Sequence, residues 1–298
     1  MRAWLALAAP LLAALCCWAG AYAAAGPGVG RVVAAFLRRN LLAMASYRFR
    51  TAMLLVNGAL AVLLLALAAR GFLAPALRGV LAGPAGSAIR FVVTGAALWP
   101  AIWAGYAASS STLRQEQMLG TMEVVAATPC GVEAVPVAAL AGSGGGALLV
   151  AAGTLGVAFV AFPMGGLDAW GIPVAAAALV LAMLFLWGVG LAVGALTVNV
   201  KQLGGFDASL RLMLLLVSGV YFPPGLLPGW LEAVGHALPL ALGLQVAREA
   251  LDGTARALPT VVARGILAGA ALLGAAVGAR LLRTGLRAAR RSGRLQGY

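Results

Sequence analysis

Charged and polar side chains gather in one short stretch of this chain, residues 109–136, between two long apolar segments. Three of the eight acidic residues of the protein lie there with one arginine, and the four are Arg114, Glu116, Glu123 and Glu133. Such groups can form ion pairs and charge-assisted hydrogen bonds with another surface. They lack the paired arrangement of carboxylates that acid–base catalysis uses. We therefore interpret residues 109–136, the polar island, as a contact surface.

Few other residues could do chemistry. Lys201 is the only lysine and lies in NVKQLGG, so the Gly-Lys-Ser/Thr end of a P-loop is missing and the chain is not a P-loop ATPase. His236 is the only histidine. A proton relay would need partners along a buried path, so we favour a structural or interfacial role for it. Cys16, Cys17 and Cys130 lack the spacing of a disulfide framework or a metal site.

The elements that must position the polar island are membrane helices. Hydrophobic residues make up 63% of the 298 residues and charged residues 10%, which is more apolar surface than one soluble core can bury. The apolar runs are continuous, which favours helices over the alternating strands of a barrel. The net charge of +13 comes mostly from arginines at the ends of these runs, which indicates anchoring at a membrane surface and not binding of nucleic acid. We predict an all-α integral membrane protein.

Six runs have the length of about 20 apolar residues that a helix needs to cross a membrane. They are residues 51–69, 88–108, 136–162, 173–197, 204–222 and 259–280, and together they predict a six-helix transmembrane core. If residue 50 lies in the cytoplasm, fourteen basic residues lie inside and six lie outside. Because Lys and Arg near span ends are retained in the cytoplasm, the polar island and the carboxyl terminus are predicted to be cytoplasmic.

The first 25 residues do not fit the six-helix pattern. One arginine, an apolar run and AYAAAG resemble a secretory signal, but cleavage would leave Arg31, Arg38 and Arg39 outside, against the charge bias. An extra helix with its amino end outside, or a translation start placed too far upstream, also explains this segment. The predicted organisation is an apolar extension (1–25), an interfacial helix (26–50), a six-span domain (51–283) and a basic cytoplasmic tail (284–298).

The segment before the first span has the pattern of a helix that lies on the membrane. Its apolar residues recur at helical spacing, while its three arginines fall largely off that stripe, which predicts a cytoplasmic amphipathic helix whose guanidinium groups face lipid phosphates. A simple extension of the first span is the alternative. The stripe consists of Val33, Phe36, Leu37, Leu41 and Met44.

Residues 221–253 are too apolar for an ordinary loop, and four prolines break them: Pro223, Pro224, Pro228 and Pro239. This pattern predicts short outer re-entrant or interfacial helices, with Trp230 at the depth of the lipid headgroups. Just before them, Asp207 and Arg211 are four residues apart near the cytoplasmic start of the fifth span. We predict that these two pair on one helix face for a structural reason.

Inside the polar island, Thr112 and Gln115 have the spacing of a capping box, which predicts a short helix that begins there. Pro129 disfavours helical backbone at Thr128 and should end it. A cytoplasmic loop that carries solvated charges explains the same residues equally well. The predicted helix has an acidic face (Glu116, Gly120 and Glu123) and a separate apolar face (Met118, Met122 and Val125).

Two motifs resemble the permease subunits of type-2 ABC exporters. The first is Glu116-Gln-Met-Leu-Gly120-Thr121-Met-Glu123 followed by Thr128-Pro129, similar to the family's E-x-x-x-G-T-x-E and T-P signature. The second resembles the segment after the family's fifth helix, and it comprises Gly219-Val-Tyr221-Phe222-Pro223, Pro228-Gly-Trp230, Leu238-Pro239-Leu240 and Arg248-Glu249-Ala250-Leu251. Order, spacing and topology agree from about residue 31 to 283, and residues 1–25 depart from the pattern.

The resemblance implies a half-transporter that is not itself an enzyme. Two permease chains, identical or closely homologous, would form a pathway in a bacterial inner membrane for an amphipathic small molecule or a glycan. Separate P-loop ATPase subunits, which hold the ATP and Mg, would dock beneath them, so no cofactor is expected in this chain. The coupling helix would carry Arg114, Glu116, Gly120, Thr121 and Glu123, with its exit at Thr128 and Pro129. The arginines of residues 31–50 would lie on the family's interfacial helix, where they could also touch the ATPase.

A self-sufficient secondary transporter or channel is the alternative class. It would need ionisable residues near the midplane or an inverted repeat, and the spans carry almost no central charge and no such repeat. A membrane-embedded enzyme or assembly factor would need a catalytic cluster, which His236 alone does not supply.

Overall fold

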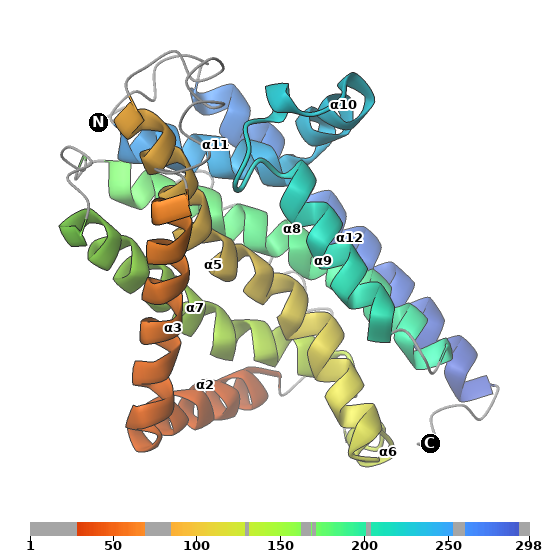
Figure 1. The fold of residues 1–298 in the computed structure, drawn as a ribbon. Helices are drawn as coiled ribbons and strands as arrows, with labels where there is room; N and C mark the ends of the chain where they lie inside the picture. Colours follow the sequence, from red (N-terminus) through yellow and green to blue (C-terminus); the bar gives the residue numbers. More distant parts are fainter. Residues whose placement is uncertain are drawn as a thin grey trace.

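The computed structural model describes residues 29–68, 85–128, 131–161, 168, 171–200, 204–252 and 260–291. Within these ranges the chain is helical apart from turns and contains no strand, so the predicted all-α class is confirmed for the described part. Residues 1–25, Pro129, Lys201 and the three cysteines lie outside it. The elements, drawn in Figure 1, are α2 (Val29–Ser46), α3 (Arg48–Ala68), α5 (Ala85–Met118), α6 (Met122–Ala126), α7 (Ala134–Ala161), α8 (Gly171–Asn199), α9 (Gly204–Val217), η2 (Pro224–Leu226), α10 (Gly229–Ala237), α11 (Pro239–Leu251) and α12 (Thr260–Arg291).

Among the described residues, four helices are long and apolar enough to cross a membrane: α5, α7, α8 and α12. The apolar part of α3 covers only Ala52–Ala68. Helix α9 has 14 residues, or about 21 Å of helix, which is less than a hydrocarbon core of about 30 Å. Four of the six expected spans therefore have membrane length, and the complete six-helix core stays a prediction.

Three helix ends differ from those expected. Helix α5 continues to Met118 and α12 to Arg291. Loss of apolar character marks the edge of a membrane and not the end of a helix, and Arg, Gln and Glu are good helix formers. Helix α9, by contrast, ends at Val217, because Gly219 adopts a left-handed backbone with φ of +71°, a conformation that often ends a helix.

Helix α8 forms the centre of the bundle, and most of its side chains are buried against α5, α11 and α12. Glycines bring α8 and α12 close together. A Cβ added at Gly188 would lie 2.2 Å from the Gly274 carbonyl oxygen, and one added at Gly278 would lie 2.2 Å from the Gly188 carbonyl oxygen. Gly274 and Gly278 have the G-x-x-x-G spacing that permits such approach in lipid, where helices associate by close packing. The α8–α12 contact is therefore a tightly packed part of the bundle.

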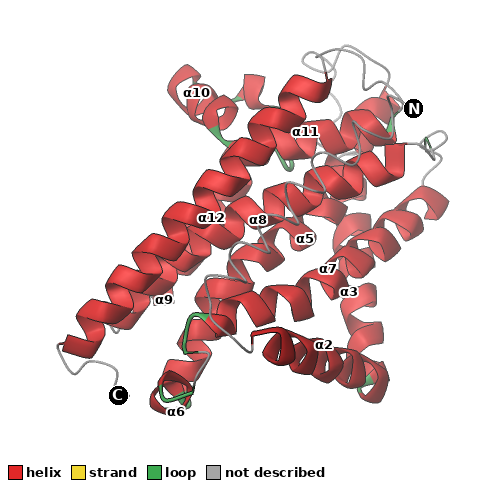
Figure 2. Cartoon of the chain, turned by 180° about the vertical axis from the view of Figure 1, so that it is seen from behind, coloured by secondary structure: helices red, strands yellow, loops and turns green. Residues whose placement is uncertain are grey.

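The two ends of the bundle carry different elements. Figures 1 and 2 both show α2, α6 and the last turns of α12 at one end, and α10 and α11 at the other. We call these the α6 end and the α11 end. Helix α2 packs on α7 with Val33 buried, and Arg31, Arg38 and Arg39 are exposed on it. The structure does not describe the side chains of the other four residues of the predicted apolar stripe, which are Phe36, Leu37, Leu41 and Met44.

Candidate functional site

The polar island contains a sharp turn between α5 and α6. Gly120 has φ of +67°. The N–H of Thr121 donates to the Glu116 carbonyl and the N–H of Gly120 donates to the Gln117 carbonyl, each at 3.1 Å. These two bonds form a Schellman motif, in which a left-handed glycine ends a helix. The turn therefore fixes the direction in which α6 leaves the end of α5.

The side chains of Glu116 and Thr121 stabilise the same turn. The Thr121 hydroxyl donates to Oε2 of Glu116 at 2.5 Å and lies 3.3 Å from the Glu116 carbonyl oxygen. A Schellman motif often has a hydrophobic contact between these two positions, and here a hydrogen bond to a carboxylate replaces it. The glutamate, glycine and threonine of the first motif thus have one shared local role, which is to shape this turn.

Three predictions for this segment are wrong. Thr112 does not begin a helix, because α5 already runs through it and its backbone is paired within that helix. Glu116 and Glu123 do not share a helix face, because the turn separates α5 from α6. The predicted apolar face is absent too, since the Met118 side chain is 70% exposed whereas that of Met122 is 1% exposed.

Helix α6 is a short exposed helix at the end of the bundle. Burial of Met122 anchors it, whereas Glu123 and Val124 are exposed. The Thr128 hydroxyl then donates to the Val125 carbonyl at 2.6 Å, which closes the turn after the helix. The outer face of α6 therefore offers a carboxylate beside an apolar side chain.

Replacing Gly120 with alanine is expected to destabilise the turn by about 1 kcal/mol, because a Cβ is disfavoured at positive φ. No described atom lies within 4 Å of the added Cβ, so the cost is one of backbone conformation and not of a clash. Gly145→Ala is the matched control, since Gly145 also faces open space but lies in α7, where alanine is favoured. Thermal unfolding should give a lower Tm for the first variant only, and equal Tm values would contradict this account of the turn.

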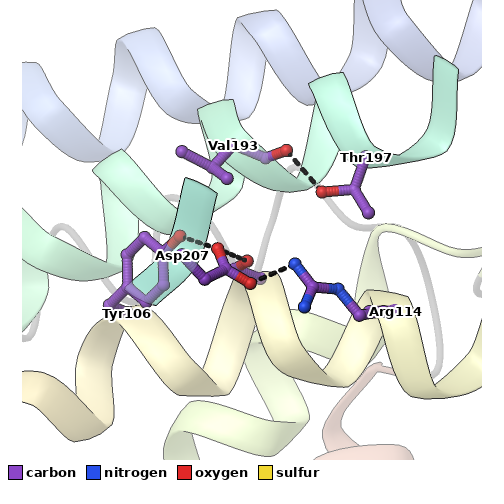
Figure 3. Close-up of polar contacts among 6 residues, drawn as sticks. Tyr106, Arg114, Val193, Thr197 and Asp207 are labelled. Atoms are coloured by element: carbon purple, nitrogen blue, oxygen red, sulfur yellow. Dashed lines mark hydrogen bonds and ion pairs between the residues drawn. The ribbon is translucent and has the colours of Figure 1, made fainter. Parts of the chain in front are cut away.

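A carboxylate on α9 joins three polar side chains on one face of α5 (Figure 3). Asp207 accepts hydrogen bonds from the Tyr106 hydroxyl and the Arg114 guanidinium, and the Ser110 hydroxyl lies 3.4 Å from its Oδ1. On neighbouring α8, Thr197 donates to a carbonyl of its own helix and takes no part. The side chains of Arg114 and Asp207 are 26% and 18% exposed, so solvent screens this ion pair less than a pair at the surface.

The predicted pair between Asp207 and Arg211 is wrong. The Asp207 carboxylate is engaged by α5, and the Arg211 guanidinium lies over the Trp103 ring, 5.4 Å from its centroid. Arg114, which is expected in the ATPase-coupling segment, forms an ion pair with Asp207 within the chain. It lies about one turn before the end of α5, so it connects the base of the α6 turn to α9.

A second ion pair ties the far side of the polar island to α12. Nε of Arg283 donates to Oε2 of Glu133 at 2.8 Å, and both side chains are 35% exposed. The two residues are 150 positions apart, so no sequence spacing could have paired them. Of the three acids in the polar island, Glu116 and Glu133 bond within the chain, and Glu123 is the exposed one.

At the α11 end, buried Arg248 connects the parts of the second motif. Its Nη1 donates to the Gly219 carbonyl at 2.9 Å and its Nη2 to the Val220 carbonyl at 2.8 Å, and its guanidinium lies 3.7 Å from the centroid of the Phe91 ring. Gly95 leaves room for it, since a Cβ there would lie 2.2 Å from Nη2. Burial lowers the pKa of Arg248 to about 9, and the Asp252 carboxylate opposes this shift, so the group stays charged at neutral pH.

Replacing Arg248 with lysine is expected to lower Tm by about 4–8 °C, because the ammonium cannot reach both carbonyls and one buried acceptor loses its partner. Arg287→Lys, at an exposed position of α12, is the control and should leave Tm unchanged. An unchanged Tm for Arg248→Lys, measured on the purified protein in detergent, would show that the hydrogen bonds of Arg248 to Gly219 and Val220 do not stabilise the fold.

The other residues of the second motif surround short helices. Pro228 precedes α10 and Pro239 begins α11, as the proline pattern predicts. Trp230 is 70% exposed. His236 is exposed and lies 3.6 Å from Glu232 on the same helix. The remaining motif residues are buried or half-buried beside them: Gly219, Tyr221, Phe222 and Pro223.

A cavity of about 430 Å³ opens between these helices and the start of α5. Its charged lining is balanced, with Arg90 and Arg248 against Glu249 and Asp252. Nε of Arg90 lies 2.5 Å from Oδ1 of Asp252, so this pair joins α5 to the end of α11. Neither residue belongs to a sequence motif, because their partnership depends on a tertiary contact.

Comparison with known proteins identifies the family. No curated protein and no solved structure matches this chain. Residues 31–251 match the family model of the ABC-2 type transporter, and this range includes the turn before α6, Asp207 with its partners on α5, and buried Arg248. The described part also has four helices of membrane length. The chain therefore belongs to the ABC-2 type transporter family and is a membrane permease component of an ABC transport system.

Proposed function

We propose that this chain is the permease subunit of an ABC exporter, driven by a separate P-loop ATPase that docks on α6 from the cytoplasm. The observation that carries the proposal is the exposed face of α6, where Glu123 and Val124 project from a turn that Gly120 and the Glu116–Thr121 hydrogen bond hold in place. A rigid, exposed element suits the transmission of force between subunits. The Glu123 carboxylate would pair with an arginine or lysine of the ATPase.

The charge distribution supports a cytoplasmic location for the α6 end. Exposed arginines of α2 and of the last turns of α12 lie at this end, among them Arg31, Arg38, Arg290 and Arg291. Basic residues near span ends are retained in the cytoplasm, where they also meet anionic lipids. The α11 end would then face the outside of a bacterial inner membrane.

The proposed mechanism is a population shift. Closure of the ATPase dimer on ATP stabilises one arrangement of the permease over another, and it can do so only through contacts that differ between the two. A displacement of α6 moves the end of α5, and the Arg114–Asp207 ion pair passes it to α9. In the proposed dimer of two permease chains, the cargo would be an amphipathic small molecule or a glycan. ATP and Mg would be bound by the partner alone.

Co-expression with a P-loop ATPase encoded beside this chain tests the proposal. The expected result is a stable complex that exports an amphipathic dye from vesicles in the presence of ATP. Replacement of the P-loop lysine of the ATPase should stop export and leave the complex intact. Export that persists with this inactive ATPase, driven by an ion gradient, would contradict the proposal and favour a secondary transporter.

A further inference from the structure

Arg211 is an exposed charged residue on α9, whose exposed face is otherwise largely apolar, and the nearest polar group that its charge acts on is the Tyr221 phenol. Among the described residues it has no hydrogen bond and no ion pair, and its side chain is exposed. Arginines in membrane helices rarely face hydrocarbon, and they usually meet protein or a water-filled cavity on a substrate path. Its exposed neighbours on α9 are Phe206, Leu212, Met213 and Leu216.

The contact with Trp103 places Arg211 far from both ends of α5. The nearest charged residues of α5 on either side of Trp103 are Arg90 and Arg114, which are about 36 Å apart along the helix. A hydrocarbon core of about 30 Å fits between them, and Trp103 lies near the middle of this part of α5. Sequence position places Arg211 near the cytoplasmic start of the fifth span, whereas its guanidinium contacts α5 at Trp103.

One partly exposed aromatic ring, that of Trp103, lies beside Arg211. It stacks on buried Trp99, with ring centroids 5.9 Å apart, and on buried Tyr106, with centroids 4.5 Å apart, and these contacts hold it in place. The exposed part of the Trp103 ring can pack against an apolar body. The planar guanidinium presents several N–H donors that match a carboxylate, phosphate or sulfonate. Asp207, the acid one helical turn away, is engaged by Arg114 and Tyr106.

We propose that Arg211 and Trp103 form a subsite on the transport pathway that binds the anionic group of an amphipathic cargo. The inference rests on the proposed permease function and specifies its substrate class, which is an apolar, preferably aromatic molecule with an acidic group. The two competing explanations are an arginine that faces lipid and an arginine covered by the second permease copy.

A matched pair of fluorescent probes tests the subsite. They are 1-anilinonaphthalene-8-sulfonate, an anion, and N-phenyl-1-naphthylamine, its uncharged counterpart with the same rings. Binding to the full chain in phosphatidylcholine nanodiscs is measured by energy transfer from tryptophan. Arg211→Gln is expected to weaken binding of the sulfonate by about tenfold or more, because a charged hydrogen bond is lost, and to leave the neutral probe unchanged. Arg211→Lys should retain part of the sulfonate affinity.

The control is Arg287→Gln, which removes the same charge from an exposed position of α12. It is expected to leave both probes unchanged. Sulfonate binding that falls equally in Arg287→Gln would show attraction by the net charge and would overturn the proposal. So would an unchanged sulfonate affinity in Arg211→Gln, or an equal loss of both probes. Phosphatidylglycerol added to the nanodiscs distinguishes a lipid anion from a free one. If the anionic lipid occupies the subsite, it should weaken binding of the sulfonate to the chain that carries Arg211 and not to Arg211→Gln.

A cysteine at position 211 tests whether the residue faces water. In a chain whose three native cysteines are replaced by alanine, Arg211→Cys should react with a charged methanethiosulfonate reagent, and the naphthalene sulfonate should slow this reaction. A cysteine that does not react would place the residue in lipid or against the second copy and would exclude the subsite. These measurements need no ATPase, so a failure of ATPase docking on α6 would leave their outcome unchanged.

Discussion

Replacing Glu123 with arginine is expected to abolish transport while the helical bundle stays folded. The side chain is exposed on α6, so the change creates no cavity and breaks no hydrogen bond found in the described chain. In the proposed complex, an arginine or lysine of the ATPase pairs with the Glu123 carboxylate, so the new arginine would place two positive charges against each other. Like charges at an interface cost several kcal/mol, so the ATPase should bind about 30-fold or more weakly.

Two measurements separate this effect from misfolding. Tm of the purified permease should be unchanged, whereas co-purification of the ATPase and export by the reconstituted complex should be lost. The matched control is Glu232→Arg, which makes the same change of charge at the α11 end, on α10. Normal export by the Glu123 variant, or equal loss in both variants, would argue against docking on α6.

Replacing Asp207 with alanine is expected to damage both stability and coupling. It leaves the Arg114 guanidinium without its carboxylate and the Tyr106 hydroxyl without its acceptor, in a region where both side chains of the ion pair are largely buried. The loss should be about 2 kcal/mol, or about 4–8 °C in Tm. Because α9 is then no longer tied to α5, ATP hydrolysis should continue with much less export.

Exchanging the charges tests whether the pair itself is responsible. Arg114→Asp combined with Asp207→Arg should recover a substantial part of the stability and export that each single change removes, which a double-mutant cycle measures. Breaking the more exposed Glu133–Arg283 pair with Arg283→Gln is the control and should cost less than about 1 kcal/mol. Additive losses in the double variant would show that the two side chains act independently.

The membrane helices could be predicted from sequence because their causes are local. Continuous apolar runs indicate membrane helices wherever they occur, and α7 and α8 follow the predicted ranges closely. The exposed acid Glu123 was found from a local signal too, an excess of charge in an apolar chain. The turn at Gly120 was missed, because a glycine can also lie inside a helix and its positive φ is a property of the folded backbone.

The helix partners could not be predicted, because they depend on tertiary contacts. The i,i+4 spacing suggested a pair between Asp207 and Arg211, yet a buried face of α5 with three polar groups competes successfully for the carboxylate. Arg248 lay in a motif, but nothing in its neighbours along the chain showed that it was buried beneath Gly219 and Val220. The capping box at Thr112 failed for the opposite reason, since a capping signal has no effect inside a helix that has already begun.

Site-specific photo-crosslinking from α6 tests the central claim most directly. A photoreactive phenylalanine derivative is placed at Val124 on α6 or, as a matched control, at Trp230 on α10, which are 69% and 70% exposed. In the assembled transporter, the account predicts a covalent adduct with the P-loop ATPase from position 124 and none from position 230. An adduct from position 230 and none from position 124 would contradict it.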